Sequence, residues 1–192
     1  MIIDSFLFFQ ELDLLEIRLK YLYPLVDYFI IVEAKQSFTG ASKKYIFEKN
    51  SKRYSKYINK IIYYKIEDVH YSYDHLINFL DKSNSKVKEK ICNILKKHNY
   101  YDKNNLSHVL DSYHRECLHL ALSKVCNSED IVLLSDLDEI PSFQVLKNLK
   151  QEKSLKSLTV FVQNEFQYYL NNYANNIWYG TIACPYKLIK KY

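Results

Sequence analysis

The sequence contains very little glycine. Only Gly40 and Gly180 occur among its 192 residues, so neither a P-loop nor a Gly-x-Gly-x-x-Gly fingerprint can form. Those glycine-rich turns let the backbone cradle phosphates in P-loop proteins and in Rossmann-type dinucleotide sites. ATP hydrolysis at a Walker site and Rossmann-type NAD binding are therefore excluded.

Arginine is also scarce. The formal net charge is +5, yet only Arg18, Arg53 and Arg115 are arginines, and lysine supplies the rest of the positive charge. Reading of base edges and bidentate clamping of phosphates depend mainly on arginine. We therefore expect no nucleic-acid partner.

Several local patterns are missing as well. The four cysteines form no Cys-x-x-Cys pair and no zinc-ligand spacing; they are Cys92, Cys117, Cys126 and Cys184. No run of 18 apolar residues occurs, and no basic segment precedes the first apolar run. These absences predict a cytoplasmic protein without a transmembrane segment, and the lysines leave a peripheral contact with a membrane surface open.

The most informative stretch is the run from Ile131 to Pro141. Four apolar residues lead directly into Asp136, Asp138 and Glu139. A short continuous apolar run is typical of a strand buried on both faces, and ligands of open α/β sheets bind beyond the carboxyl ends of such strands. Carboxylates suit Mn²⁺ or Mg²⁺, with a diphosphate supplying further ligands. We expect Pro141 to lie in the first turn of a following helix.

The remaining chain alternates between strand and helix patterns, which predicts an α/β domain with a mostly parallel central sheet flanked by helices. Strands are expected over residues 1–9, 28–32, 61–66, 131–134, 158–162, 166–170 and 177–184. Helices are expected over residues 11–19, 45–60, 86–97, 105–125 and 143–150. The length suits one domain, with a nucleotide-binding part over about residues 1–141 and an acceptor-side part over about 142–192.

Other residues with catalytic potential have simpler interpretations. His114 and His119 lie five positions apart on an expected helix, and no His-Glu-x-x-His pattern occurs, so hydrogen-bonded structural histidines are favoured. Arg115 could reach a diphosphate or pair with Glu116 or Asp111. A haloacid-dehalogenase-like phosphatase needs further aspartates downstream, and Asp138 is the last aspartate in the chain.

Several blocks resemble glycosyltransferase family seventeen, the β-1,4-mannosyl-glycoprotein 4-β-N-acetylglucosaminyltransferase-like enzymes. The similar blocks are residues 4–19, residues 26–34 with Phe38-Thr39-Gly40, His114-Arg115 in place of a Gln-Arg pair, Ser135 to Pro141, and the region through residues 178–181. The resemblance implies a GT-A-like fold with a metal site at a strand end. The Gly-Trp-His-like block that family members carry further on is absent, which leaves truncation and divergence both open.

The resemblance also implies a UDP-sugar donor, with transfer to a glycan or lipid-linked saccharide and inversion at the sugar carbon. Asp138 and Asp136 would hold Mn²⁺ or Mg²⁺ against the diphosphate. Arg115, Gln10, Glu11 and Glu33 are the candidates for contacts with the nucleotide. Glu139 and Glu165 are the carboxylates that could act as the catalytic base.

Two other functions remain open at this stage. One is a non-catalytic domain that binds sugar nucleotides or glycans, and it would bind UDP without releasing it from a donor. The other is a nucleotidyltransferase that makes a nucleotide sugar. That reaction consumes UTP and releases pyrophosphate, and the absence of a glycine-rich triphosphate loop counts against it.

Overall fold

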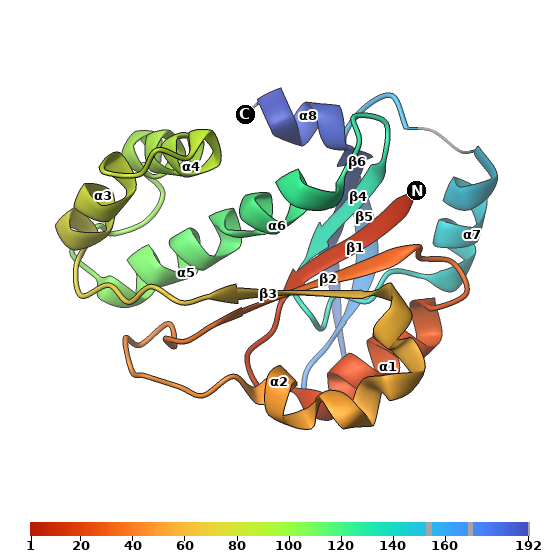
Figure 1. Ribbon diagram of the computed structural model, residues 1–192. Helices are drawn as coiled ribbons and strands as arrows, with labels where there is room; N and C mark the ends of the chain where they lie inside the picture. Colours follow the sequence, from red (N-terminus) through yellow and green to blue (C-terminus); the bar gives the residue numbers. More distant parts are fainter. Residues whose placement is uncertain (153–154, 169–170, 192) are drawn as a thin grey trace.

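The computed structural model describes residues 1–152, 155–168 and 171–191, which build one six-stranded sheet with helices on both faces (Figure 1). The strands are β1 (Ile2–Leu7), β2 (Tyr28–Ala34), β3 (Ile61–Ile66), β4 (Ile131–Ser135), β5 (Thr159–Phe166) and β6 (Tyr173–Pro185), in the order β3-β2-β1-β4-β6-β5. The first four of this order are parallel, β6 is antiparallel to β4, and β5 is antiparallel to β6. The expected mostly parallel, helix-flanked sheet is confirmed.

The helices form two layers, one on each face of the sheet (Figure 1). One layer contains α3 (Tyr73–Asp81), α4 (Lys86–Lys97), α5 (Leu106–Glu116), α6 (Leu118–Val125) and α8 (Tyr186–Lys191). The other contains α1 (Leu12–Leu22), α2 (Ile46–Asn50), the 3₁₀ helix η1 (Ser51–Lys60) and α7 (Phe143–Glu152). No helix in the described ranges is long and apolar enough to cross a membrane.

Strand β1 lies in the middle of the sheet between β2 and β4. Its side chains alternate between the two faces, as the period of a strand requires. Ile3 packs into the core beneath α3–α6, whereas Ile2 and Phe6 pack into the core beneath α1 and α7. Asp4 shares that second face and is fully buried, so it requires a partner of opposite charge.

Two of the expected helices differ in the structure. Residues 45–60 form a single turn of α-helix and then η1, whose buried residues Tyr54 and Tyr57 are three apart, the period of a 3₁₀ helix. The expected helix over residues 105–125 is broken at Cys117. There the amide of Leu120 bonds to the carbonyl of Cys117, 3.0 Å away and only three residues earlier, which tightens the turn.

The expectation for Pro141 is wrong. Pro141 is buried in the loop before α7, and the carbonyl of Ser142 accepts the first helical hydrogen bond, from Leu146. The carbonyls of Glu139 and Ile140 are already bonded to Thr181 and Gln163 of the neighbouring strands. Since those two carbonyls are bonded elsewhere, the helix begins only after the proline.

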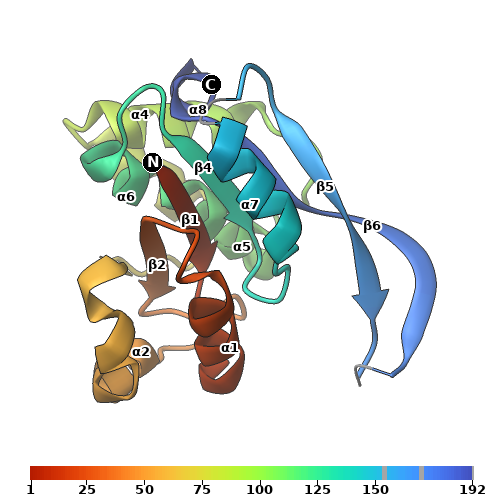
Figure 2. The same cartoon turned by 90° about the vertical axis from the view of Figure 1, so that its right-hand side faces the viewer.

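The last two strands are longer than expected and form a projecting hairpin. β5 continues to Phe166 and β6 already begins at Tyr173, so the separate strand expected over residues 166–170 is wrong at its start, while residues 169–170 lie outside the described ranges. Figure 2 shows the hairpin extending beyond the body of the sheet. The part formed by residues 162–168 and 171–179 is called the arm below.

Candidate active site

The three acids after β4 lie in a tight turn that caps itself. The amide of Asp136 donates to Glu139 Oε2 at 3.0 Å, and the amide of Glu139 donates to the carbonyl of Asp136 at 3.1 Å. The amide of Ile140 bonds to the carbonyl of Asp138 at 3.0 Å. Residues 136–140, called the acidic turn below, therefore have a defined backbone from which the side chains of Asp136 and Asp138 project.

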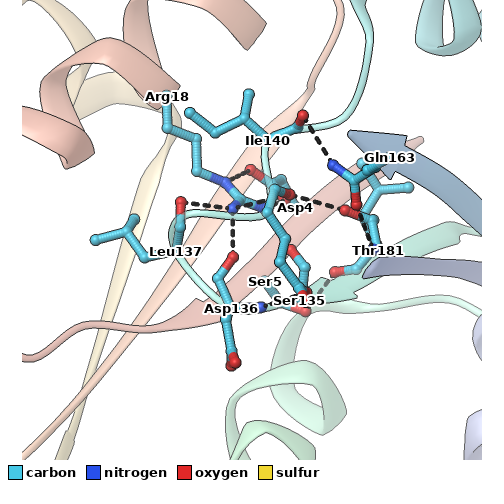
Figure 3. A network of polar contacts seen from close by, with 11 residues as sticks. Asp4, Ser5, Arg18, Ser135, Asp136, Leu137, Ile140, Gln163 and Thr181 are labelled. Atoms are coloured by element: carbon cyan, nitrogen blue, oxygen red, sulfur yellow. Dashed lines mark hydrogen bonds and ion pairs between the residues drawn. The ribbon is translucent and has the colours of Figure 1, made fainter. Parts of the chain in front are cut away.

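Arg18 of α1 anchors the acidic turn from the protein interior (Figure 3). Its guanidinium and the carboxylate of Asp4 form a bidentate pair with distances of 2.9 and 2.7 Å, and both side chains are fully buried. The remaining donors reach Ser135 Oγ at 2.6 Å and the carbonyls of Asp136 and Leu137 at 2.7 and 3.0 Å. One buried arginine therefore joins β1, α1 and the acidic turn.

The arm and β6 hold the acidic turn from the other side (Figure 3). Thr181 Oγ1 donates to the carbonyl of Glu139 at 2.8 Å, and Gln163 Nε2 donates to the carbonyl of Ile140 at 3.0 Å. Trp178 Nε1 donates to Glu139 Oε1 at 2.8 Å. A β-carbon at Gly180 would lie 1.9 Å from the side-chain oxygen of Gln163, so this glycine makes room for the contact.

An open cavity of about 240 Å³ lies above the acidic turn; we call it cavity 1. Its charged and polar lining comes from Glu11, Gln36, Lys43, His114, Arg115, Asp136 and Asp138, and its apolar lining from residues at the ends of β1 and β2 and from Phe9, Leu14, Phe38 and Leu137. The cavity thus lies beyond the carboxyl ends of parallel strands, where α/β sheets bind their ligands.

Aromatic rings cover one side of cavity 1. The rings of Phe9 and Phe38 are stacked, with centroids 6.2 Å apart, and Phe38 contacts the ring of His114 at 5.5 Å. Burial lowers the pKa of His114 to about 4, so its imidazole is neutral at neutral pH. The three rings therefore offer an uncharged surface on which a planar base can pack.

Arg115 and Asp136 form a bidentate ion pair at the edge of cavity 1. Two nitrogens of the guanidinium lie 2.5 and 3.2 Å from the carboxylate of Asp136, and its Nε lies 3.1 Å from Asp111. Burial disfavours the charge of Arg115, but these two carboxylates outweigh it and raise the pKa of the guanidinium. Both side chains are half exposed, so a phosphate can replace either carboxylate as the partner of Arg115.

The ion pair also separates cavity 1 from a second cavity. Cavity 2, of about 280 Å³, shares Leu7, Arg115 and Asp136 with cavity 1 and continues towards α6, β6 and α8. Glu139 and Gly180 line it, whereas Asp138 lines cavity 1 alone. The two cavities therefore lie on either side of the pair.

Asp138 is the carboxylate that best suits a divalent cation. Its side chain is exposed and makes no hydrogen bond or ion pair with any described residue, and it projects into cavity 1 next to Asp136. Within the described ranges, no three His, Cys, Asp or Glu residues form a metal cluster. Mg²⁺ and Mn²⁺ sites in phosphate-binding enzymes commonly use one or two carboxylates plus substrate oxygens, and this donor set fits that pattern.

Glu33 does not line either cavity. Its fully buried carboxylate accepts hydrogen bonds from Lys43 Nζ at 2.6 Å, from the amides of Ile46 and Phe47 at 2.6 and 3.1 Å, and from the hydroxyl of Tyr63 at 2.7 Å. It binds the start of α2 and positions the ammonium of Lys43, which lines cavity 1. Glu33 therefore acts on the site through Lys43.

Replacing Glu33 by glutamine should destabilise the fold by about 3 kcal/mol. Every partner of the buried carboxylate is a hydrogen-bond donor, and the NH₂ group of glutamine would place two further donors among them. Thermal unfolding monitored by circular dichroism measures this loss. Glu48→Gln is the matched control, since Glu48 pairs with Lys65 at the surface. Equal unfolding temperatures for the two variants would contradict a structural role of Glu33.

The other candidates are spread more widely. Glu11 lines cavity 1, where its Oε2 accepts the amides of Phe9 and Gln10, but Gln10 itself is exposed and lines neither cavity. Glu165 lies on the arm, bonded to Gln167 at 3.0 Å, and lines neither cavity. The structure thus brings Glu11, Arg115, Asp136 and Asp138 to cavity 1 and Glu139 to cavity 2.

Several residues of the site were not foreseen from the sequence. Arg18 falls on the same helical face as Leu15, Leu19 and Leu22, and this interruption of an apolar stripe, together with Asp4 inside an apolar strand, is a visible signal of a buried ion pair. Phe38 and Lys43 belong to a loop, and no periodicity shows that this loop folds over β1.

Comparison with protein families supports the resemblance seen in the sequence. Residues 1–104, more than half of the chain, match the model of glycosyltransferase family 17. The matched region contains β1, β2, the loop with Lys43 and Arg18, and it ends before the acidic turn. Comparisons with curated proteins and with solved structures found no match.

Proposed function

This chain belongs to glycosyltransferase family 17, and from that membership we propose that it moves a sugar, GlcNAc in the first instance, from a UDP-sugar to a hydroxyl of a glycan or lipid-linked saccharide, with metal assistance and inversion. The main observation behind the proposal is the set of charged side chains that line cavity 1. The exposed carboxylate of Asp138, which has no partner among the described residues, lines the cavity together with the positively charged side chains of Lys43 and Arg115.

Each part of a nucleotide sugar has a matching surface. The neutral rings of Phe9, Phe38 and His114 suit the planar base. Arg115 can form a bidentate contact with the diphosphate, which would replace its present contact with Asp136. Cavity 2 begins on the far side of that pair and suits the sugar.

A divalent cation held by Asp138 and Asp136 would neutralise the negative charge that builds up on the departing UDP. The exchange of Arg115 from Asp136 to the diphosphate would free the second carboxylate for that cation. Arg18, Thr181 and Gln163 keep the acidic turn in place while this exchange takes place, because their hydrogen bonds go to its backbone carbonyls. The turn is thus preorganised, and only its side chains need to change partners.

The first test is calorimetric titration of UDP with Mn²⁺ and then with a chelator, followed by measurement of UDP release from UDP-GlcNAc. We expect binding that requires Mn²⁺, and slow release of UDP even with water as acceptor. Arg115→Met should weaken UDP binding by about tenfold to a hundredfold, since a charge-assisted bidentate contact contributes roughly 1.5–3 kcal/mol.

Three outcomes separate the alternatives. Binding of UDP with no release from any UDP-sugar would favour a non-catalytic binding domain. Release of pyrophosphate from UTP and a sugar phosphate would favour a nucleotidyltransferase. Absence of UDP binding both with Mn²⁺ and with chelator would reject the proposed donor site altogether.

A further inference from the structure

Cavity 2 contains a carboxylate–imidazole pair that the proposed donor site does not use. Glu116 Oε2 lies 3.4 Å from His119 Nε2, and both side chains line the cavity together with Asp136 and Glu139. The pair spans the junction of α5 and α6, where a spacing of three residues places both side chains on one face. It therefore lies next to the acidic turn, on the side away from cavity 1.

The two carboxylates considered from the sequence as the catalytic base fit that role poorly. Both oxygens of Glu139 already accept hydrogen bonds, from the amide of Asp136 and from Trp178 Nε1, and these contacts join the acidic turn to the arm. Glu165 bonds to Gln167 and Asn176 on the arm and lines neither cavity. Glu139 thus lines cavity 2 with both of its oxygens already bonded, and Glu165 lies outside the cavity, so neither is well placed to take a proton from an incoming hydroxyl.

His119 has that access. Its side chain is 27% exposed and that of Glu116 is 18% exposed, so the pair is largely enclosed yet open to the cavity. Glu116 lies on the Nε2 side of the ring at ion-pair distance, and Nδ1 has no hydrogen-bond partner among the described residues, so Nδ1 is the ring nitrogen that can accept a proton. A carboxylate beside Nε2 favours a proton on that nitrogen and stabilises the imidazolium that forms.

We propose that His119, positioned by Glu116, is the general base that deprotonates the acceptor hydroxyl in cavity 2. This inference rests on the proposed glycosyl transfer. The acceptor oxygen forms a bond to the anomeric carbon as the bond from that carbon to the UDP oxygen breaks. The hydroxyl proton passes to His119 Nδ1, and the electron pair of the broken bond leaves with UDP.

The test replaces the hydroxyl with a nucleophile that carries no proton. His119→Ala should release UDP from UDP-GlcNAc with water as acceptor about 10²- to 10⁴-fold more slowly than the unaltered protein, the usual contribution of a general base. Sodium azide should restore UDP release in this variant and yield the glycosyl azide, because azide needs no deprotonation. UDP affinity measured by calorimetry should remain unchanged, which shows that the variant is folded.

Two control variants complete the design. His108→Ala changes an exposed histidine of α5 that lines neither cavity, and it should hydrolyse UDP-GlcNAc at the original rate and gain nothing from azide. Glu116→Gln should lower the rate less than His119→Ala, with the fall in kcat rather than in KM, because the base remains but loses its orienting partner.

Two kinds of result would contradict these proposals, one for the role of His119 alone and one for the proposed transferase as a whole. Unchanged hydrolysis by His119→Ala, or a loss that azide does not reverse, would show that His119 is not the base while leaving the transferase assignment intact. An unaltered protein that neither binds UDP with Mn²⁺ nor releases it from UDP-GlcNAc would overturn the proposed function and this inference together.

Discussion

Asp138→Ala should weaken Mn²⁺-dependent binding of UDP by about a hundredfold or more, with no measurable change in stability. In the proposed donor site this variant would lose one of the two protein carboxylates that hold the cation, and neutralisation of a diphosphate by a metal ion contributes several kcal/mol. Stability should stay within about 0.5 kcal/mol, because the exposed Asp138 side chain has no partner among the described residues. Calorimetric titration of UDP, with Mn²⁺ and with chelator, measures the first effect, and thermal unfolding measures the second.

Asp74→Ala is the matched control for this result. Asp74 is an exposed aspartate in the first turn of α3 and lines neither cavity. The Asp74→Ala substitution removes the same charge from the protein as Asp138→Ala does, so any general effect of net charge on UDP binding appears in both variants. Equal UDP affinities for Asp138→Ala and Asp74→Ala would show that Asp138 does not hold the cation.

Arg18→Met should destabilise the protein by about 3–5 kcal/mol, the range observed when one partner of a buried ion pair is removed. The carboxylate of Asp4 would remain fully buried without its partner, and the carbonyls of Asp136 and Leu137 would lose their donor. For a domain of this size the unfolding temperature should fall by roughly 6–20 °C. Thermal unfolding by circular dichroism or calorimetry measures the shift.

Arg53→Met separates the buried pair from arginine loss in general. Arg53 bonds to Asp13 and Glu16 on the solvent side of α1, so the variant removes the same side chain from a surface ion pair. Its unfolding temperature should change little, since surface pairs contribute little to stability. If both variants unfold at the same temperature, Arg18 does not carry the structural role assigned to it.

Much of the fold could be predicted because its elements have clear local patterns. A strand was expected over residues 61–66 and a helix over residues 86–97, and both are found with those bounds, as β3 and α4. Continuous apolar runs identify buried strands without reference to the rest of the chain. The arm was harder to predict, because both of its strands carry exposed apolar side chains and no single face is buried.

The candidate site could be predicted only in part, for a physical reason. Strand-end position identified the acidic turn, because the carboxyl ends of parallel strands share one edge of a sheet. The same reasoning selected Glu33, yet its side chain points into the protein and binds Lys43. Successive side chains of a strand point to opposite faces of the sheet. An error of one residue in the expected position therefore places a side chain on the wrong face, away from the cavity. Arg18 interrupts the apolar stripe of α1, which indicates a buried ion pair, but no local pattern shows that its guanidinium also bonds to the carbonyl of Asp136, 118 residues later.

The position of β1 between β2 and β4 also affects folding while the chain is being synthesised. β1 and its neighbour β2 are close together in the sequence, whereas Ile131, the partner of Ile2 on β4, is added 129 residues after Ile2. At roughly 5–20 residues per second a ribosome needs about 6–26 s to add that length, and during this time one edge of β1 stays unpaired. An unpaired apolar edge recruits other strands. Newly made chains should therefore depend on chaperones, and slower translation should lower the yield of soluble protein.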